Sequence, residues 1–222
     1  MGVPVGVRWE VGAFLGLTAA TGLIDAVSYL KLGHTFVANM TGNVVFLGFA
    51  VAPGSGFRLG PPVVAVLGFV LGSLLGGRAA RVLEARPRRW LGIAFGAQAA
   101  VLLLCGLLVG VGVLRDSGGT SYLLILALAG CFGLQNATVR HAAPKDLTTT
   151  VLTLTLPGLA ADSVLGNGRA APPYRRLGSI LAMLAGAAAG ALLLQVTIAW
   201  VIVLAGTVVA AAATIFVLAP AD

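Results

Sequence analysis

Long apolar runs separated by short polar connections dominate the pattern along this chain. Six of these runs are long enough to cross about 30 Å of hydrocarbon as helices. They lie near residues 11–33, 61–83, 91–114, 119–140, 176–196 and 198–219. Unbroken runs of this length favour helices over the short alternating strands of an outer-membrane barrel. The sequence therefore predicts an all-α, polytopic membrane protein that forms one membrane domain over residues 1–222.

Two further runs, roughly 36–52 and 147–165, are shorter, more polar and interrupted by Pro or Gly. If both crossed the membrane, the arginine clusters at 78–89 and 169–176 would face opposite sides, although Arg and Lys tend to remain in the cytoplasm. If both instead return to the side they came from, both clusters and both termini are cytoplasmic. We therefore expect six full spans and two short broken or re-entrant segments.

The composition agrees with a membrane protein, because 59% of the residues are apolar, 9% are charged and the mean hydropathy is +1.02. The net charge of +7 comes largely from clustered arginines, which we interpret as topology signals, and no nucleic-acid partner is expected. The chain has no phosphate-binding loop, HExxH, GxSxG or close carboxylate pair. His34 and His141 have no third ligand in the sequence around them. Neither an enzyme nor a metal or other cofactor is expected.

An internal repeat relates the two halves of the chain. The stretch "GLIDAVSYL" at Gly22 is echoed by "GLQNATVRH" at Gly133, half a chain length further on. The stretch "ANMTGN" from Ala38 corresponds to "TVLTLT" from Thr150 at almost the same separation. Self-similarity of this kind indicates a duplicated unit. We place the first repeat at about 11–114 and the second at about 119–219.

Each predicted repeat holds three full spans and one short polar segment, so the second repeat should insert upside down relative to the first. This is the inverted-repeat plan of many secondary transporters, whose broken helices form the binding site near the bilayer midplane. Small-xxx-small spacings occur in both halves and allow close helix packing. These glycines are Gly68, Gly72 and Gly76 in the first half and Gly186 and Gly190 in the second.

Asp25 is a carboxylate well inside the first span, where an unpaired charge costs about 2.5 to 3.5 kcal/mol. It therefore needs a partner, a proton or water. We interpret it as a protonatable or cation-coordinating group in a pathway; the alternative is a carboxyl satisfied by a neighbouring helix. Its repeat mate is Asn136, which with Gln135 is a candidate partner. Ser28 and Tyr29 lie one turn further on, and Tyr29 shares the face of Asp25.

The stretch "FVANMTGN" is typical of a chain break followed by a helix start. Asn39 or Thr41 should cap the following helix, and Gly42 should permit close backbone approach, with Asn43 one residue further on. A half-helix that begins inside the membrane directs free N–H groups and its positive dipole end toward an anion.

The second half offers a similar threonine-rich stretch, "DLTTTVLTLTLPG", with Thr149, Thr150 and Thr153 as candidate binding residues. The alternative for all these polar side chains is that they only hydrogen-bond neighbouring helices. We leave both interpretations open for the threonines and favour a binding role for Asn39, Thr41 and Asn43.

Together, "GLIDAVSYLKLG…FVANMTGN" and "GLQNA…TTTVLTLTL" resemble the bacterial YoaK family, also catalogued as domain of unknown function 1275. The positions that match its pattern are Gly22, Asp25, Ala26, Ser28, Asn39, Thr41, Gly42 and Asn43. The resemblance spans nearly the whole chain and implies a multi-span protein of the bacterial inner membrane, without a settled activity. By analogy, the arrangement is similar to the crossed half-helices of sulfate and uracil permeases.

The leading hypothesis is a small secondary transporter for a small anionic or carboxylate-bearing solute. An ionised Asp25 would repel such a solute, so proton symport is the consistent version. A passive channel is one alternative, and a non-transporting membrane protein that binds lipid or assists assembly is another. Because 222 residues are few for alternating access, we also expect a homodimer in contact with membrane lipid.

Overall fold

The computed structural model describes residues 5–83, 85–142, 157, 160–161 and 173–221. Within these residues, six helices are long and apolar enough to cross a membrane. They are α1 (Val7–Lys31), α3 (Gly60–Leu83), α4 (Pro87–Gly110), α5 (Gly119–Ala142), α7 (Pro173–Leu193) and α8 (Ile198–Leu218). The prediction of an all-α protein with six full spans is confirmed, although α1 and α4 begin about four residues earlier than the apolar runs indicated.

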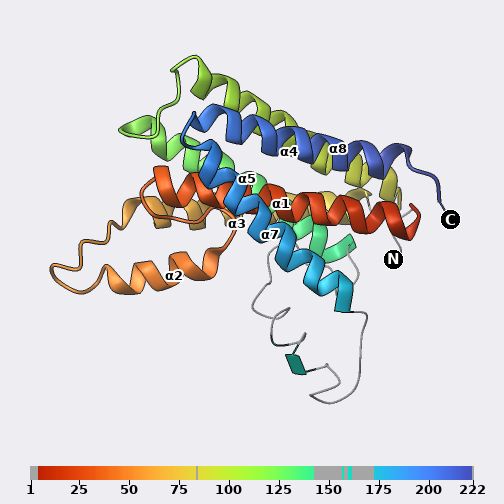
Figure 1. Cartoon of the computed structure of the whole chain (residues 1–222), viewed down its shortest axis with the longest axis horizontal. Coiled ribbons are helices and arrows are strands. Elements are labelled where there is room, and N and C mark those ends of the chain that lie inside the picture. Colours follow the sequence, from red (N-terminus) through yellow and green to blue (C-terminus); the bar gives the residue numbers. More distant parts are fainter. Residues whose placement is uncertain (1–4, 84, 143–156, 158–159, 162–172, 222) are drawn as a thin grey trace.

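A seventh described helix, α2 (Met40–Phe49), is too short to span a membrane. Its ten residues extend about 15 Å, which is half of the hydrocarbon core. After α1 ends, the chain turns back along α1, and α2 then runs toward the end of the bundle at which α1 stopped (Figure 1). The first short segment is therefore a re-entrant loop and helix.

The second expected short segment, 147–165, falls almost wholly outside the described residues. The candidate residues Thr149, Thr150 and Thr153 belong to this stretch, so their predicted role in binding stays a prediction.

The long helices pack in pairs around α1. Helix α1 packs against α7 and α8, α3 packs against α5, and α4 packs against α8. Most residues of α1 between Ala13 and Ser28 are buried. A helix in this position has no lipid-facing side along much of its length, so its polar residues meet protein rather than hydrocarbon.

Glycines allow two of these helix pairs to approach closely. In the pair of α1 and α7, a Cβ on Gly22 would collide with the backbone of Met183, and one on Gly190 would lie 2.9 Å from the carbonyl oxygen of Leu23. In the pair of α5 and α3, a Cβ on Gly133 would collide with the backbone of Phe69. Small residues at such crossings give close packing in membranes, where apolar burial contributes little between helices.

Candidate functional site

The Asp25 carboxylate holds the re-entrant segment against α1. Asp25 is 5% exposed and lies six residues before the end of α1, about 9 Å along the helix. Its Oδ1 accepts the backbone N–H groups of Val37 at 3.1 Å and Ala38 at 3.0 Å, and its Oδ2 accepts a hydrogen bond from Asn39 Nδ2. A carboxylate is an acceptor with room for all three donors. The carboxylate is therefore satisfied by the returning chain.

Asn43, in the first turn of α2, holds the same segment from the other side. Its Oδ1 accepts from the Thr35 hydroxyl and from the Phe36 N–H, both at 2.9 Å, and its Nδ2 donates to the Phe36 carbonyl oxygen at 2.5 Å. Thr35 and Asn43 are fully buried. We call residues 35–38 together with Asp25, Asn39 and Asn43 the Asp25 turn. It converts a break in the chain into a fixed backbone conformation.

The start of α2 differs from the sequence-based expectation. Asn39 occupies the N-cap position, but its side chain makes no capping hydrogen bond and donates to Asp25 instead. Thr41 is exposed. The prediction that Asn39 or Thr41 caps α2 was therefore wrong: the Asn39 side chain is held by the hydrogen bond from its Nδ2 to Asp25, and its Oδ1 accepts no N–H group of α2. Gly42 does permit a close approach, since a Cβ there would lie 2.7 Å from the Phe36 ring.

The other candidates near Asp25 separate into different environments. The buried Ser28 hydroxyl donates to the Asp25 backbone carbonyl at 3.2 Å. Asn136 Nδ2 donates to the Phe132 carbonyl of its own helix at 2.9 Å. None of the hydrogen bonds that the described residues give to the Asp25 carboxylate comes from Gln135 or Asn136. Their expected partnership with Asp25 is therefore replaced by the Asp25 turn.

Gln135 instead joins three helices through side-chain amides. Its Oε1 accepts from Gln98 Nε2 of α4 at 2.7 Å, and its Nε2 donates to the Thr21 hydroxyl of α1 at 3.0 Å. We call Thr21, Gln98 and Gln135 the amide network. Gln98 is 2% exposed, and its Oε1 has no hydrogen-bond partner among the described residues. Sequence reasoning missed Gln98 and Thr21; a lone glutamine inside an apolar run was the available signal for Gln98.

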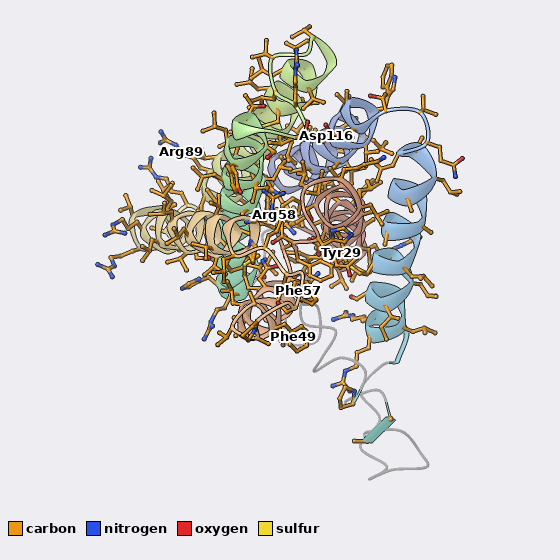
Figure 2. The ribbon with its side chains drawn as sticks, turned by 90° about the vertical axis from the view of Figure 1, so that its left-hand side faces the viewer. Tyr29, Phe49, Phe57, Arg58, Arg89 and Asp116 are labelled. Carbon is orange, nitrogen blue, oxygen red and sulfur yellow. The ribbon has the colours of Figure 1, made fainter. Side chains whose placement is uncertain are left out.

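A cleft of about 570 Å³ opens where α1 ends, beside α2 and the start of α3. We call it the end cleft. Figure 2 looks onto this end of the bundle, where Tyr29, Phe57 and Arg58 lie near one another. Aromatic and basic side chains form much of its lining. They are Tyr29, Lys31, His34, Phe46, Phe57 and Arg58.

The end cleft carries positive charge on its rim. Lys31 and Arg58 are exposed cations whose side chains make no hydrogen bond or ion pair with the part of the chain that the structure describes. No acidic residue is found among the described residues that line it. A cleft with such a lining attracts anions. Tyr29 was a candidate from the sequence, whereas Lys31 and Arg58 were missed because they are distant in sequence and meet only at the end of the bundle.

The backbone brings His34 to the cleft by an unusual conformation. Gly33 has a φ of 87° and His34 a φ of 56°, two successive residues in the left-handed region. That region is uncommon for any residue other than glycine, and His is among the types enriched there. The His34 and Tyr29 rings are nearly perpendicular, with their centroids 5.4 Å apart.

Proteins similar to this chain share most of its length. Residues 13–215 match the family described as "Protein of unknown function (DUF1275)". The chain is 30% identical over 150 residues to the "UPF0700 transmembrane protein YoaK" of Bacillus subtilis (strain 168). The match covers 68% of this chain and spans 64% of the relative's length. No solved structure matches the chain.

Proposed function

The chain belongs to the DUF1275 family, as its Asp25 motif predicted, and we propose that it is a small proton-linked transporter of an anionic or carboxylate-bearing solute. The observation that carries the proposal is the end cleft, whose cations Lys31 and Arg58 lie next to a re-entrant segment. Re-entrant and broken helices in membrane proteins are tolerated where they are buried in protein or line a cavity, and they commonly form solute sites.

In this proposal the re-entrant segment is the gate of the cleft, and Asp25 acts on that segment rather than on the solute. Its carboxylate oxygens accept from Val37, Ala38 and Asn39. A proton added to that carboxylate would occupy one acceptor position and place an O–H among three donors. The turn would lose hydrogen bonds and α2, which borders the cleft through Phe46, would be released. Proton binding and movement of the cleft wall are thereby linked without contact between Asp25 and the anion.

The packing of glycines supports the proposed inverted repeat. Gly22 and its repeat mate Gly133 each lie against the backbone of a partner helix, at Met183 and Phe69 respectively. These two partner positions are likewise separated by about half the chain. The first helix of each proposed repeat thus packs on the second long helix of the other. We further propose a homodimer in the bacterial inner membrane, with both termini cytoplasmic and the end cleft facing outward.

Transport can be tested in proteoliposomes that enclose the pH dye pyranine. Sulfate, phosphate, succinate and benzenesulfonate are supplied outside, because these ions stay charged and cross a protein-free bilayer slowly. A proton symporter acidifies the lumen when one of them is added, and Arg58→Gln should weaken that signal. Absence of acidification with all four ions, in vesicles that contain folded protein, would contradict the proposal.

A non-transporting structural role is the second candidate, because the hydrogen bonds of the Asp25 carboxylate stay inside the Asp25 turn, and those of the Asn43 side chain stay within the turn and the first residue of α2. That role predicts that variants of the turn lower stability while no tested ion moves. A passive channel would instead conduct without lumenal acidification.

A further inference from the structure

We propose that the end cleft binds a planar aromatic anion, a ring that bears a carboxylate. This inference rests on the proposed function for the location of the site and goes beyond it in naming the chemical class of the ligand. Two features of the same cleft carry it: a wall of aromatic rings and a rim of cations.

The aromatic wall is a run of nearly parallel rings, of which Tyr29, Phe46 and Phe57 line the cleft while Phe36 stacks between the first two. Tyr29 stacks on Phe36 with centroids 5.0 Å apart, and Phe36 stacks on Phe46 at 6.0 Å. Phe46 stacks in turn on Phe57 at 5.7 Å, and the interplanar angle is 20° in each of these three pairs. Offset stacking between rings is favourable beyond the area that it buries.

The run ends at Phe57, whose ring also meets the Phe49 ring at a tilted angle. Phe57 is 42% exposed and lines the cleft, as Tyr29 and Phe46 do. A flat ligand ring can therefore pack on this wall in the geometry that the protein's own rings already adopt. A sulfate or phosphate ion would gain nothing from such a wall, and neither would the phosphate group of a lipid.

The cationic rim supplies the partner for the acid group. The Arg58 guanidinium is a planar fork that matches a carboxylate, and Lys31 adds a compact positive charge. His34, brought to the cleft by its left-handed backbone, adds an imidazole. The cleft volume of about 570 Å³ is within the range of small-molecule sites. A small aromatic acid fits both the chemistry and the space.

The test is binding of three carboxylates to the purified full chain in nanodiscs of phosphatidylcholine, measured by calorimetry. Benzoate and cyclohexanecarboxylate have similar size and the same charge, whereas acetate lacks the ring. We expect benzoate to bind roughly 2- to 12-fold more tightly than cyclohexanecarboxylate, and acetate to bind weakest.

Matched variants separate the wall from the rim. Phe57→Leu should remove most of the preference for benzoate. Phe49→Leu should keep most of it, because Phe49 packs against Phe57 with centroids 5.3 Å apart but does not itself line the cleft. Arg58→Gln should weaken every carboxylate by about 2- to 5-fold. Arg89→Gln removes an exposed arginine from the opposite end of the bundle (Figures 1 and 2) and should change nothing.

Each contrary result overturns a different statement. Equal affinities for the three carboxylates would overturn the aromatic class and leave an anion site. No carboxylate binding, together with an Arg58-dependent stabilisation by phosphatidylglycerol nanodiscs, would assign the cleft to a lipid phosphate and overturn the inference. A clear preference for benzoate without lumenal acidification in the vesicle assay would support the site and contradict the transporter.

Discussion

Two buried polar clusters, the Asp25 turn and the amide network, supply hydrogen-bond partners to buried polar groups in different ways. The Asp25 turn uses one carboxylate and short amides, and its main partners are backbone groups of a single segment. The amide network uses long side chains to connect α1, α4 and α5, and it leaves Gln98 Oε1 without a partner among the described residues. Backbone donors cannot move away when their acceptor is lost, whereas side chains can rotate. The turn should therefore be far more sensitive to substitution than the network.

The largest loss of stability is expected for Asp25→Leu. The substitution leaves the buried N–H groups of Val37 and Ala38 and the Asn39 amide without their acceptor. Each unsatisfied buried donor costs about 1 to 3 kcal/mol, so the free energy of unfolding should fall by about 3 to 5 kcal/mol. Reversible unfolding in mixed SDS micelles measures it. A loss below about 1 kcal/mol would mean that the turn does not depend on this carboxylate.

Asn43→Leu should follow, with a loss of about 2 to 3 kcal/mol in the same measurement. It removes the acceptor of the Phe36 N–H and the donor to the Phe36 carbonyl, and it frees the Thr35 hydroxyl. Thr41→Val on the same helix is the matched control, because Thr41 is exposed and its loss should stay within about 0.5 kcal/mol. Equal losses for the two variants would mean that the hydrogen bonds of Asn43 are not what stabilises α2.

The amide network should respond less and unequally. Gln135→Leu leaves the Gln98 side chain without any hydrogen-bond partner among the described residues. Interhelical hydrogen bonds in membranes are worth about 0.6 kcal/mol on average and about 1.7 kcal/mol at most. A loss of about 1 kcal/mol in the free energy of unfolding is expected.

Gln98→Leu should be nearly neutral, because it removes the already unpaired Gln98 Oε1 and leaves only Gln135 Oε1 without its partner among the described residues. A larger loss for Gln98→Leu than for Gln135→Leu would show that Gln98 Oε1 is satisfied after all, for instance by water.

The sequence predicted the parts of this protein that depend on local pattern. Apolar run length alone located all six long helices, because a helix in hydrocarbon must satisfy its own backbone and needs about 20 residues to cross. The polar stretch from Asp25 to Asn43 was recognised, and so was its break. The role of each residue was not recognised, because the Asn39 side chain could either accept from the free N–H groups of α2 through its Oδ1 or donate to Asp25 through its Nδ2. Only the path of the returning chain decides between them.

The end cleft was largely beyond sequence reasoning for a related reason. Lys31 ends α1 and Arg58 lies in the loop before α3, and each alone is an ordinary cation at the end of a span. Phe46 and Phe57 likewise lie in separate segments, an apolar helix and a loop. Only the return of the chain toward the end of α1 places these four side chains around one space. Gln98 was missed because its partner Gln135 lies on another helix.

A small change in stability is expected for an exchange within the Asp25 turn, the double variant Asp25→Asn with Asn39→Asp. The new amide oxygen at position 25 can accept from Val37 and Ala38, and the new amide nitrogen can donate to the carboxylate at position 39, so every hydrogen bond is retained. The free energy of unfolding should stay within about 1 kcal/mol of the original. Asn39→Asp alone is the control, since it places two carboxylates face to face and should destabilise the turn.

The exchange also separates the hydrogen-bonding role of position 25 from its proposed protonation, because an amide at position 25 cannot take up the proton that the proposed gate requires. A stable double variant that no longer acidifies the vesicle lumen would place proton coupling at the Asp25 carboxylate itself. Lumenal acidification that persists would show that the proton need not bind at position 25, because the carboxylate at position 39 can take it up within the same turn. A large loss of stability would instead show that the backbone of the returning segment requires a charge, and not merely an acceptor, at position 25. The exchange thereby tests the position of the carboxylate while the hydrogen bonds of the Asp25 turn are kept.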